Sequence, residues 1–258
     1  MRLMKRILSA AAVLALSASL LVGCSSGTAS SVPVSASSAA ESTVSSVEET
    51  ASSAVDENEA AAAQLLNDLT GSYQELWPVI LADEYKQTWL DDCTALVGEE
   101  NAEAAFEKLS SMVTSDVYGE DAVEAYANGG GAYFCGFTNS LATLTFDGET
   151  STISGTDKDG NVLFSHAYHY IGMEPVRGLY EFESDDADSG EFTYFFLAPD
   201  TSAETYHIEF RYGSDAEALS QYDAGDYAYW VASGISTDCD QTMIDNCIEL
   251  FCTENLAG

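Results

Sequence analysis

The chain of 258 residues is strongly acidic, with 43 Asp and Glu residues against 8 Lys and Arg residues and a formal net charge of −35. A surface of this charge is repelled by phosphate backbones and concentrates cations, so we exclude nucleic acid as a partner. The chain also lacks the Gly-x-Ser-x-Gly elbow, the Walker loop, the Rossmann glycine pattern and the His-Glu-x-x-His motif. We therefore do not expect an enzyme.

Residues 1–23 have the layout of a secretory signal. Three basic residues precede an apolar run over 7–22, which is too short and too early to be a transmembrane span. The run ends in Leu-Val-Gly before Cys24, and this arrangement resembles the lipobox of bacterial lipoproteins, in which the cysteine is acylated. We therefore expect a lipid on Cys24 and a location at the cell surface or the periplasmic face of a membrane. The mature chain would keep 5 basic residues against 43 acidic ones, a charge near −38.

The next segment, residues 24–59, consists almost entirely of Ser, Ala, Thr, Val and Glu. Such a composition buries too little apolar surface to offset the entropy of ordering, so we expect a flexible tether. Residues 60–258 hold all 3 Trp, 14 Tyr and 11 Phe residues of the chain. This is enough for one sizeable core, and we expect one folded domain.

Five cysteines lie in this domain, so disulfides are permitted after export, but one thiol must be left over. The sequence does not assign their pairing, and it contains no Cys-x-x-Cys or Cys/His cluster at zinc-finger spacing. The five are Cys93, Cys135, Cys239, Cys247 and Cys252.

Apolar residues keep helical spacing from 60 to about 126, which predicts three or four helices broken at Pro78, Gly98 and Gly119. A last helix is predicted near the C-terminus, where apolar residues recur at i, i+3, i+4 and i+7 and place Cys247 in the core. These residues are Ile244, Cys247, Ile248 and Phe251.

After residue 131 the pattern changes to short alternating runs rich in Thr, Tyr, Phe and Ile, separated by Asp-Gly and Ser-Gly turns. Regularly spaced antiparallel strands favour a barrel, because closure removes exposed edges. The expected fold class is α+β, with N-terminal helices, an antiparallel barrel and a C-terminal helix. The predicted strands are 141–146, 151–155, 162–171, 178–183, 191–197 and 205–212.

Three segments of the domain resemble the ZinT zinc-binding family. Leu69–Pro78, Leu-Thr-Gly-Ser-Tyr-Gln-Glu-Leu-Trp-Pro, is similar to the opening of the family, and Tyr168–Gly172 and Val176–Glu183 are similar to two of its strands. The resemblance implies a calycin-like (lipocalin-like) barrel with helical additions. The family occurs alone in periplasmic proteins and fused to the zinc-binding lipoproteins of ABC importers.

The resemblance also implies a metal site, in which this chain departs from the histidines of the family. Asp200 matches the first ligand, and His207 and Glu209 match a His-x-His pair; a rival alignment instead pairs Thr205 with His207. Residues 205, 207 and 209 of one strand share a face, so His207 and Glu209 can converge, and Asp200 could reach them from the end of the preceding strand. His166 and His169 are expected to be structural.

Two carboxylates and one imidazole make a more oxygen-rich site than three histidines, so Zn²⁺ is expected first, and Mn²⁺, Fe²⁺ and Ca²⁺ also suit it. The leading hypothesis is a lipid-anchored protein that captures a divalent cation and keeps it or hands it over near an ABC importer of the same membrane. One alternative is a calycin-type barrel that binds a small ligand, with a decayed metal site. Another is a surface interaction module that uses aromatic residues of 222–230.

Overall fold

A helix over residues 57–68 opens the part of the chain that the computed structural model describes, which comprises residues 57–128, 131–199 and 207–256. The predicted signal with Cys24, most of the predicted tether, and Asp200 and Thr205 lie outside these residues. The helix includes 57–59, so ordered structure begins before residue 60, where composition placed the start of the domain. None of the described helices has the length and hydropathy needed to cross a bilayer.

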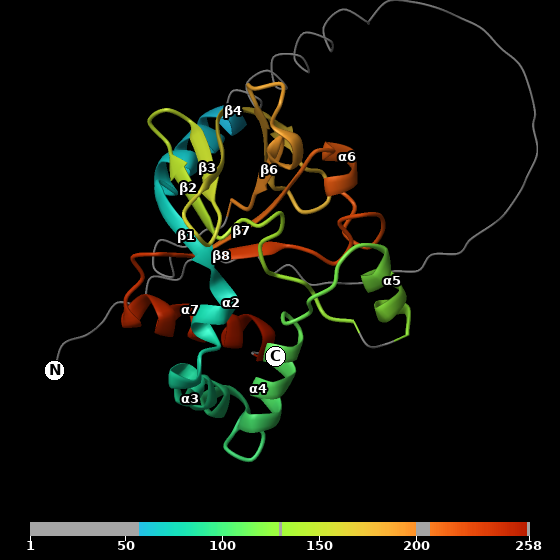
Figure 1. The fold of residues 1–258 in the computed structure, drawn as a ribbon. Coiled ribbons are helices and arrows are strands. Elements are labelled where there is room, and N and C mark those ends of the chain that lie inside the picture. The colour runs from blue at the N-terminus through green and yellow to red at the C-terminus, as the bar shows by residue number, and fades with distance from the viewer. Residues whose placement is uncertain (1–56, 129–130, 200–206, 257–258) are drawn as a thin grey trace, which may run out of the picture. The chain divides into compact units, whose positions relative to one another are not determined.

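The described strands form a closed antiparallel barrel in which each strand pairs with its neighbour in sequence and the first pairs with the last (Figure 1). This confirms the α+β fold class with an antiparallel barrel. The strands are β1 (Gly71–Glu75), β2 (Thr143–Asp147), β3 (Thr152–Thr156), β4 (Val162–Met173), β5 (Tyr180–Ser184), β6 (Tyr194–Leu197), β7 (His207–Gly213) and β8 (Ala232–Ser236).

Six of the strands lie where alternation predicted them, but β1 and β8 were not predicted. The helical reading of 60–126 was wrong for β1, whose Tyr73 lies opposite Leu144 of β2 and opposite Ser236 of β8. β8 has the small-residue sequence Ala-Ser-Gly-Ile-Ser, and a Cβ on its Gly234 would lie 3.1 Å from the Ile208 side chain. Both strands are held by pairing on two sides rather than by local propensity.

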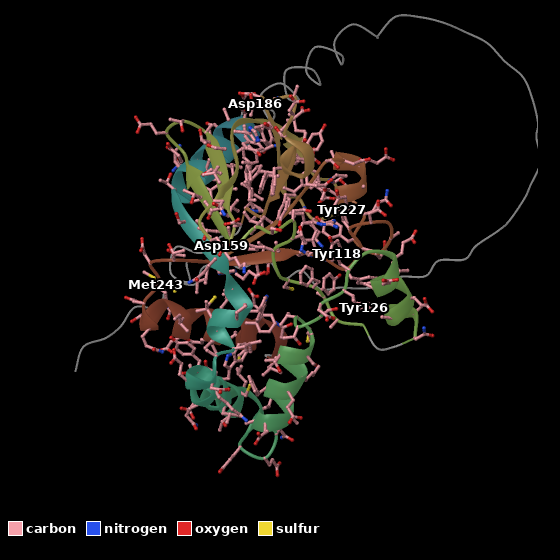
Figure 2. The ribbon with its side chains drawn as sticks, in the orientation of Figure 1. Tyr118, Tyr126, Asp159, Asp186, Tyr227 and Met243 are labelled. Atoms are coloured by element: carbon pink, nitrogen blue, oxygen red, sulfur yellow. The ribbon has the colours of Figure 1, made fainter. Side chains whose placement is uncertain are left out.

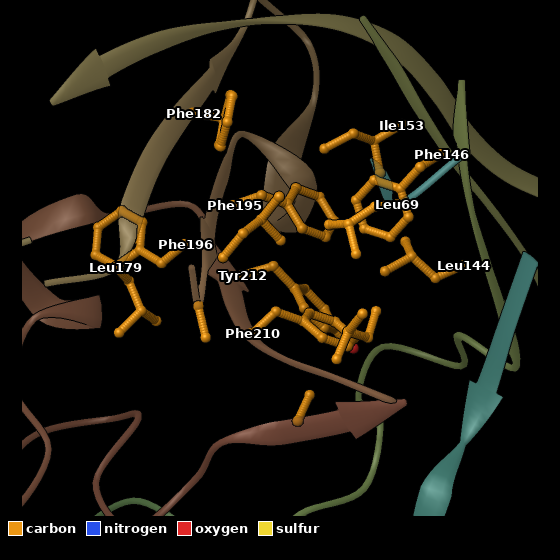
Figure 3. Packing of buried hydrophobic residues seen from close by; sticks show 14 of the residues in the cluster. Leu69, Leu144, Phe146, Ile153, Leu179, Phe182, Phe195, Phe196, Phe210 and Tyr212 are labelled. Carbon is orange, nitrogen blue, oxygen red and sulfur yellow. The ribbon is translucent and has the colours of Figure 1, made fainter. Parts of the chain in front are cut away.

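Large apolar side chains fill the interior of the barrel (Figure 3). Phe195 and Phe210 are fully buried, and Phe195 lies 5.3 Å from the Tyr212 ring, measured between centroids. The labelled side chains of Figure 3 come from five strands and from the segments beside them, and they leave the interior packed like a core rather than lined like a binding cavity.

The helices over 76–80, 86–97, 102–111 and 241–256 pack together at one end of the barrel, where they form a second core with Ile235 of β8. The helix over 57–68 instead adds Ala62, Leu65 and Leu66 to the core of the barrel. Gly98 and Gly119 flank helices as predicted, with φ values of 84° and 76°. Pro78 does not break a helix but lies in the first turn of α2 (Leu76–Ile80), where a missing N–H is tolerated. The helical elements are α2 (Leu76–Ile80), η1 (Asp83–Tyr85), α3 (Lys86–Val97), α4 (Ala102–Ser111), α5 (Glu120–Ala127), η2 (Gly190–Phe192), α6 (Ala216–Leu219) and α7 (Gln241–Leu256).

The predicted C-terminal helix is α7, and its predicted apolar stripe is the face that packs. Cys247 is 4% exposed, as expected for a core residue, and Ile248 is fully buried. Phe251 is half-buried and its ring packs edge-on against Trp77 of α2, at 4.7 Å between centroids. These contacts fix α7 beside α2, close to the outer face of β7 and β8.

Candidate functional site

The alternation of β7 decides where its polar residues point. Ile208, Phe210 and Tyr212 are buried in the barrel core. His207 and Glu209 therefore share the opposite, outward face. The sequence predicted that the two share a face. In the pairing with β8, His207 lies opposite Ile235 and Glu209 opposite Ser233.

His207 and Glu209 line one crevice between β7, α2 and α7. The crevice has a volume of about 30 Å³, which suits a water molecule or a single ion and is too small for an organic ligand. Its lining combines apolar side chains with four residues whose side chains can bind metals. The lining residues are Leu76, Trp77, Ile80, His207, Glu209, Cys247, Leu250, Phe251 and Glu254.

Two of these potential donors, Cys247 and Glu254, were not predicted as site residues. They come from α7, together with Leu250 and Phe251, at the spacing of one helix face. The periodicity of the C-terminal segment placed Cys247 in a core but gave no sign of the strand on which that core rests. Only the packing of α7 on the barrel brings this face to His207.

The thiols near Glu209 are held in the neutral state. Burial raises the pKa of Cys247 to about 12, and the negative charges of Glu209 and Glu254 act in the same direction after that of Cys239. Burial likewise raises the pKa of Cys135 to about 12, with Glu209 as the next cause. Glu209 and Glu254 thus place negative charge beside the Cys247 thiol, which favours a cation there over a further negative charge.

The donors of the crevice do not converge on one point in this structure. His207, Glu209 and Glu254 each take part in an interaction within the protein. Within residues 57–128, 131–199 and 207–256, no group of three or more His, Cys, Asp and Glu side chains is arranged to hold a metal ion. The third predicted ligand, Asp200, lies outside the described residues.

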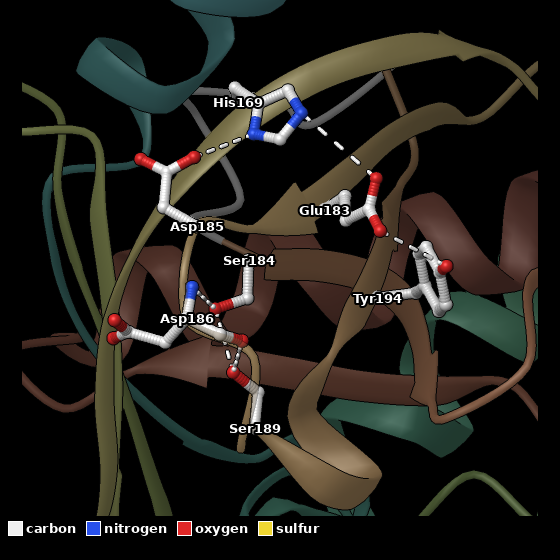
Figure 4. Close-up of polar contacts among 7 residues, drawn as sticks. All are labelled: His169, Glu183, Ser184, Asp185, Asp186, Ser189 and Tyr194. Atoms are coloured by element: carbon white, nitrogen blue, oxygen red, sulfur yellow. Dashed lines mark hydrogen bonds and ion pairs between the residues drawn. The ribbon is translucent and has the colours of Figure 1, made fainter.

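The other two histidines lie on β4 and pair with aspartates that follow β5. His169 Nδ1 is 2.7 Å from Asp185 Oδ1, and its Nε2 is 4.0 Å from Glu183 Oε2 (Figure 4). His166 Nδ1 is 2.7 Å from Asp186 Oδ2. These contacts give each ring an acidic partner. His169 lies on the outer face of the barrel, whereas His166 shares the inward side of β4 with Phe164 and Tyr168 and stacks on Phe164. The structural role expected for both stays a prediction.

A larger cavity of about 320 Å³ lies outside the barrel interior. Its wall is mainly apolar, with Trp77 and Phe134 as the aromatic residues and Glu75 as the charged one. The carboxylate Oε1 of Glu75 accepts a hydrogen bond from the Phe137 N–H at 2.6 Å. The complete lining is Glu75, Trp77, Pro78, Leu81, Val113, Thr114, Ser115, Phe134, Cys135 and Gly136.

The aromatic residues of 222–230 pack against other side chains instead of forming an exposed surface. Tyr222 is 8% exposed and Trp230 1% exposed, and the Trp230 indole donates a hydrogen bond to the Gly136 carbonyl at 2.9 Å. Tyr229 stacks on Tyr126 of α5 at 3.6 Å between centroids, and Figure 2 labels Tyr126 at this helix. The alternative of an interaction surface in this segment is therefore not favoured, because these rings join α5 to the barrel.

Comparisons with known proteins find solved structures that are similar to this chain. No family model and no curated protein matches the chain. The Zn(II)-bound ZinT-like domain of Streptococcus pneumoniae AdcA is 14% identical with a TM-score of 0.46, covering 71% of this chain and 89% of that chain. Zn(II)-bound AdcA from the same organism is 14% identical with a TM-score of 0.44, covering 72% of this chain and 35% of that chain. Both TM-scores are below 0.5, so the choice of ligand rests on the residues of this chain.

Proposed function

We propose that this protein is a lipid-anchored binder of divalent cations, with Zn²⁺ as its first cargo and His207, Glu209 and Asp200 as ligands. The observation that carries the proposal is the common crevice of His207 and Glu209, formed by two residues of β7 that share an outward face. The role is capture rather than catalysis.

The chemistry of the crevice supports a cation as cargo. Its volume of about 30 Å³ admits an ion or a water molecule. An imidazole and carboxylates are zinc ligands, and the adjacent thiol of Cys247 would favour Zn²⁺ over Mn²⁺ or Ca²⁺ if a bound ion displaced its proton. Glu254 offers a second carboxylate from α7.

The proposed anchor and tether would serve delivery of the metal. A lipid on Cys24 and a flexible segment over 24–59 would let the domain search the surface of one membrane. Tethering two binding partners to the same membrane raises their effective concentration without any new contact. We therefore propose an ABC importer for the metal as the partner that receives the cation.

Titration calorimetry of Zn²⁺, Mn²⁺, Fe²⁺ and Ca²⁺ into chelator-treated protein tests the proposal, using the chain from residue 24 with Cys24→Ser. We expect one Zn²⁺ per chain, and at least a tenfold loss of affinity, about 1.4 kcal/mol, in Asp200→Ala, His207→Ala and Glu209→Ala. A matched loss in Glu254→Ala would add the ligand from α7.

Two variants serve as controls. His169→Ala removes an imidazole from β4, and Glu217→Ala removes an exposed carboxylate from α6; both should bind Zn²⁺ as the parent protein does. Heat that is weak, many-sited and equal in all variants would mean that the acidic surface merely condenses cations, and the proposal would then be wrong.

A second candidate function is binding of a small, largely apolar molecule in the cavity of about 320 Å³, whose volume lies at the lower end for ligand sites. Because the barrel interior is packed, this cavity replaces the barrel mouth as the place for such a ligand. An environment-sensitive dye whose binding is abolished by Val113→Trp and unaffected by chelator would favour this function. A dye that does not bind would count against it.

A further inference from the structure

Two cysteines from different helices meet in the second core. Cys93 of α3 and Cys252 of α7 are both fully buried, and their Sγ atoms are 3.9 Å apart. They are separated by 159 positions in sequence, so their contact depends entirely on the packing of α3 against α7.

We propose that Cys93 and Cys252 form a disulfide in the exported protein and that this bond fastens α7 to α3. The two thiols lose two protons and two electrons as the S–S bond forms. A small-molecule or protein disulfide accepts the electrons and leaves as two thiols. The bond requires an oxidising compartment, which export through the predicted secretory signal would supply. Its formation does not depend on whether the protein binds a metal.

The helices around the two thiols are already held in a suitable register. Trp89 lies one turn before Cys93 on α3, and its ring packs edge-on against Phe251, the residue before Cys252, at 6.0 Å between centroids. The Trp89 indole also donates a hydrogen bond to the Ile80 carbonyl at 2.7 Å, which fixes the ring. A disulfide needs sulfurs at about 2.05 Å, so side-chain rotation and a small approach of the helices must close the present distance.

The environment of the thiols indicates when the bond would form. Burial raises the pKa of Cys93 and that of Cys252, which leaves little of the thiolate that attacks a disulfide. Neither sulfur is accessible to a reagent in the folded protein. Oxidation should therefore occur while the chain folds, as α7 approaches α3 but before packing encloses the sulfurs, and the finished bond should resist reductants until α7 detaches.

Peptide mapping of the exported protein tests the pairing. The protein is denatured without reductant, alkylated, digested and examined by mass spectrometry. We expect a linked pair of peptides that contain Cys93 and Cys252. Reduction should lower the melting temperature by about 5–15 °C, because opening a loop of this length restores chain entropy to the unfolded state.

Two variants make the thermal result specific. The double variant Cys93→Ala with Cys252→Ala should lose the response of the melting temperature to reductant. Cys239→Ser, which changes a half-buried cysteine outside the pair, should keep it.

The proposal is overturned if the denatured, unreduced protein alkylates at both Cys93 and Cys252, or if either is linked to another cysteine. The mapping uses the unaltered cysteines, so it decides the matter even if the double variant fails to fold.

Discussion

Replacing Arg211 by methionine removes a buried charge that holds a loop to the barrel. Arg211 lies on the outward face of β7 and is fully buried. Its guanidinium donates hydrogen bonds to the carbonyls of Leu219, Gln221 and Tyr227, the Gln221 pair at 3.3 and 3.4 Å. Its carbon Cζ also lies 4.3 Å from the centroid of the Tyr222 ring. One side chain thus serves three backbone acceptors, from the end of α6 to Tyr227.

The expected loss of stability follows from the backbone carbonyls that the substitution leaves without a hydrogen-bond donor. Each carbonyl left without a donor destabilises the fold by about 1–3 kcal/mol, which gives a gross loss of about 3–9 kcal/mol for three. Part of this is recovered because the charge is no longer desolvated; burial lowers the pKa of Arg211 to about 10, so the protonated group is disfavoured inside. We expect a net loss of about 3–5 kcal/mol for Arg211→Met. Arg211→Lys keeps the charge but not the planar fork, and should recover less than half of it.

Urea unfolding followed by tryptophan fluorescence measures this change in the free energy of unfolding. An unaltered dependence of that free energy on urea concentration would show that the unfolded state is the same. Arg177→Met is the matched control, because its guanidinium carbon lies 4.2 Å from the same Tyr222 ring on a half-buried side chain. It should lose about 1 kcal/mol. A loss below about 1 kcal/mol for Arg211→Met, or full stability in Arg211→Lys, would refute the reasoning.

Three further outcomes follow from the packing. Phe210→Ala should lower the free energy of unfolding by about 3–5 kcal/mol in the same assay, since it empties a fully buried ring position in the barrel. Gly119→Ala should lose about 1–3 kcal/mol by thermal unfolding, because φ is +76° and the new Cβ would lie 2.8 Å from the Asp226 carbonyl. Cys135 and Cys247, with pKa values of about 12, should react with iodoacetamide at pH 8 at least 100-fold more slowly than in the unfolded chain, as followed by mass spectrometry.

The barrel could be predicted from the sequence because most of its strands carry local signals. β2, β3 and β4 are separated by Asp-Gly turns, and apolar and polar residues alternate along the predicted strands. β1 and β8 carry no comparable signal, since β1 follows a helix directly and β8 is made of small residues. They close the barrel only through pairing across most of the domain, which a local pattern does not contain.

Part of the candidate site could be predicted from local sequence, and part depends on long-range packing. The common face of His207 and Glu209 follows from the period of two along any strand, so it was predictable from their spacing. Cys247 and Glu254 come near His207 and Glu209 only because α7 docks against the barrel at that place. The apolar stripe of α7 predicts a buried face but not the surface on which that face packs. The contact between Cys93 and Cys252 also depends on the docking of α7, here against α3. The sequence therefore left the pairing open, and the packing of the two helices brings this one pair together.

The outward face of β7 carries three polar residues, and their surroundings separate binding from stability. Arg211 is fully buried and bonded to backbone carbonyls, so its charge serves the fold. Glu209, two residues earlier, is exposed and borders the crevice with half-buried His207, so its charge lies at the surface where a cation can approach it. Changes at Arg211 should therefore alter the free energy of unfolding, whereas changes at His207 and Glu209 should alter the affinity for Zn²⁺ and leave the metal-free protein nearly as stable. If His207→Ala instead unfolded the metal-free protein, these polar groups would be part of the core, and the binding role would have to move elsewhere.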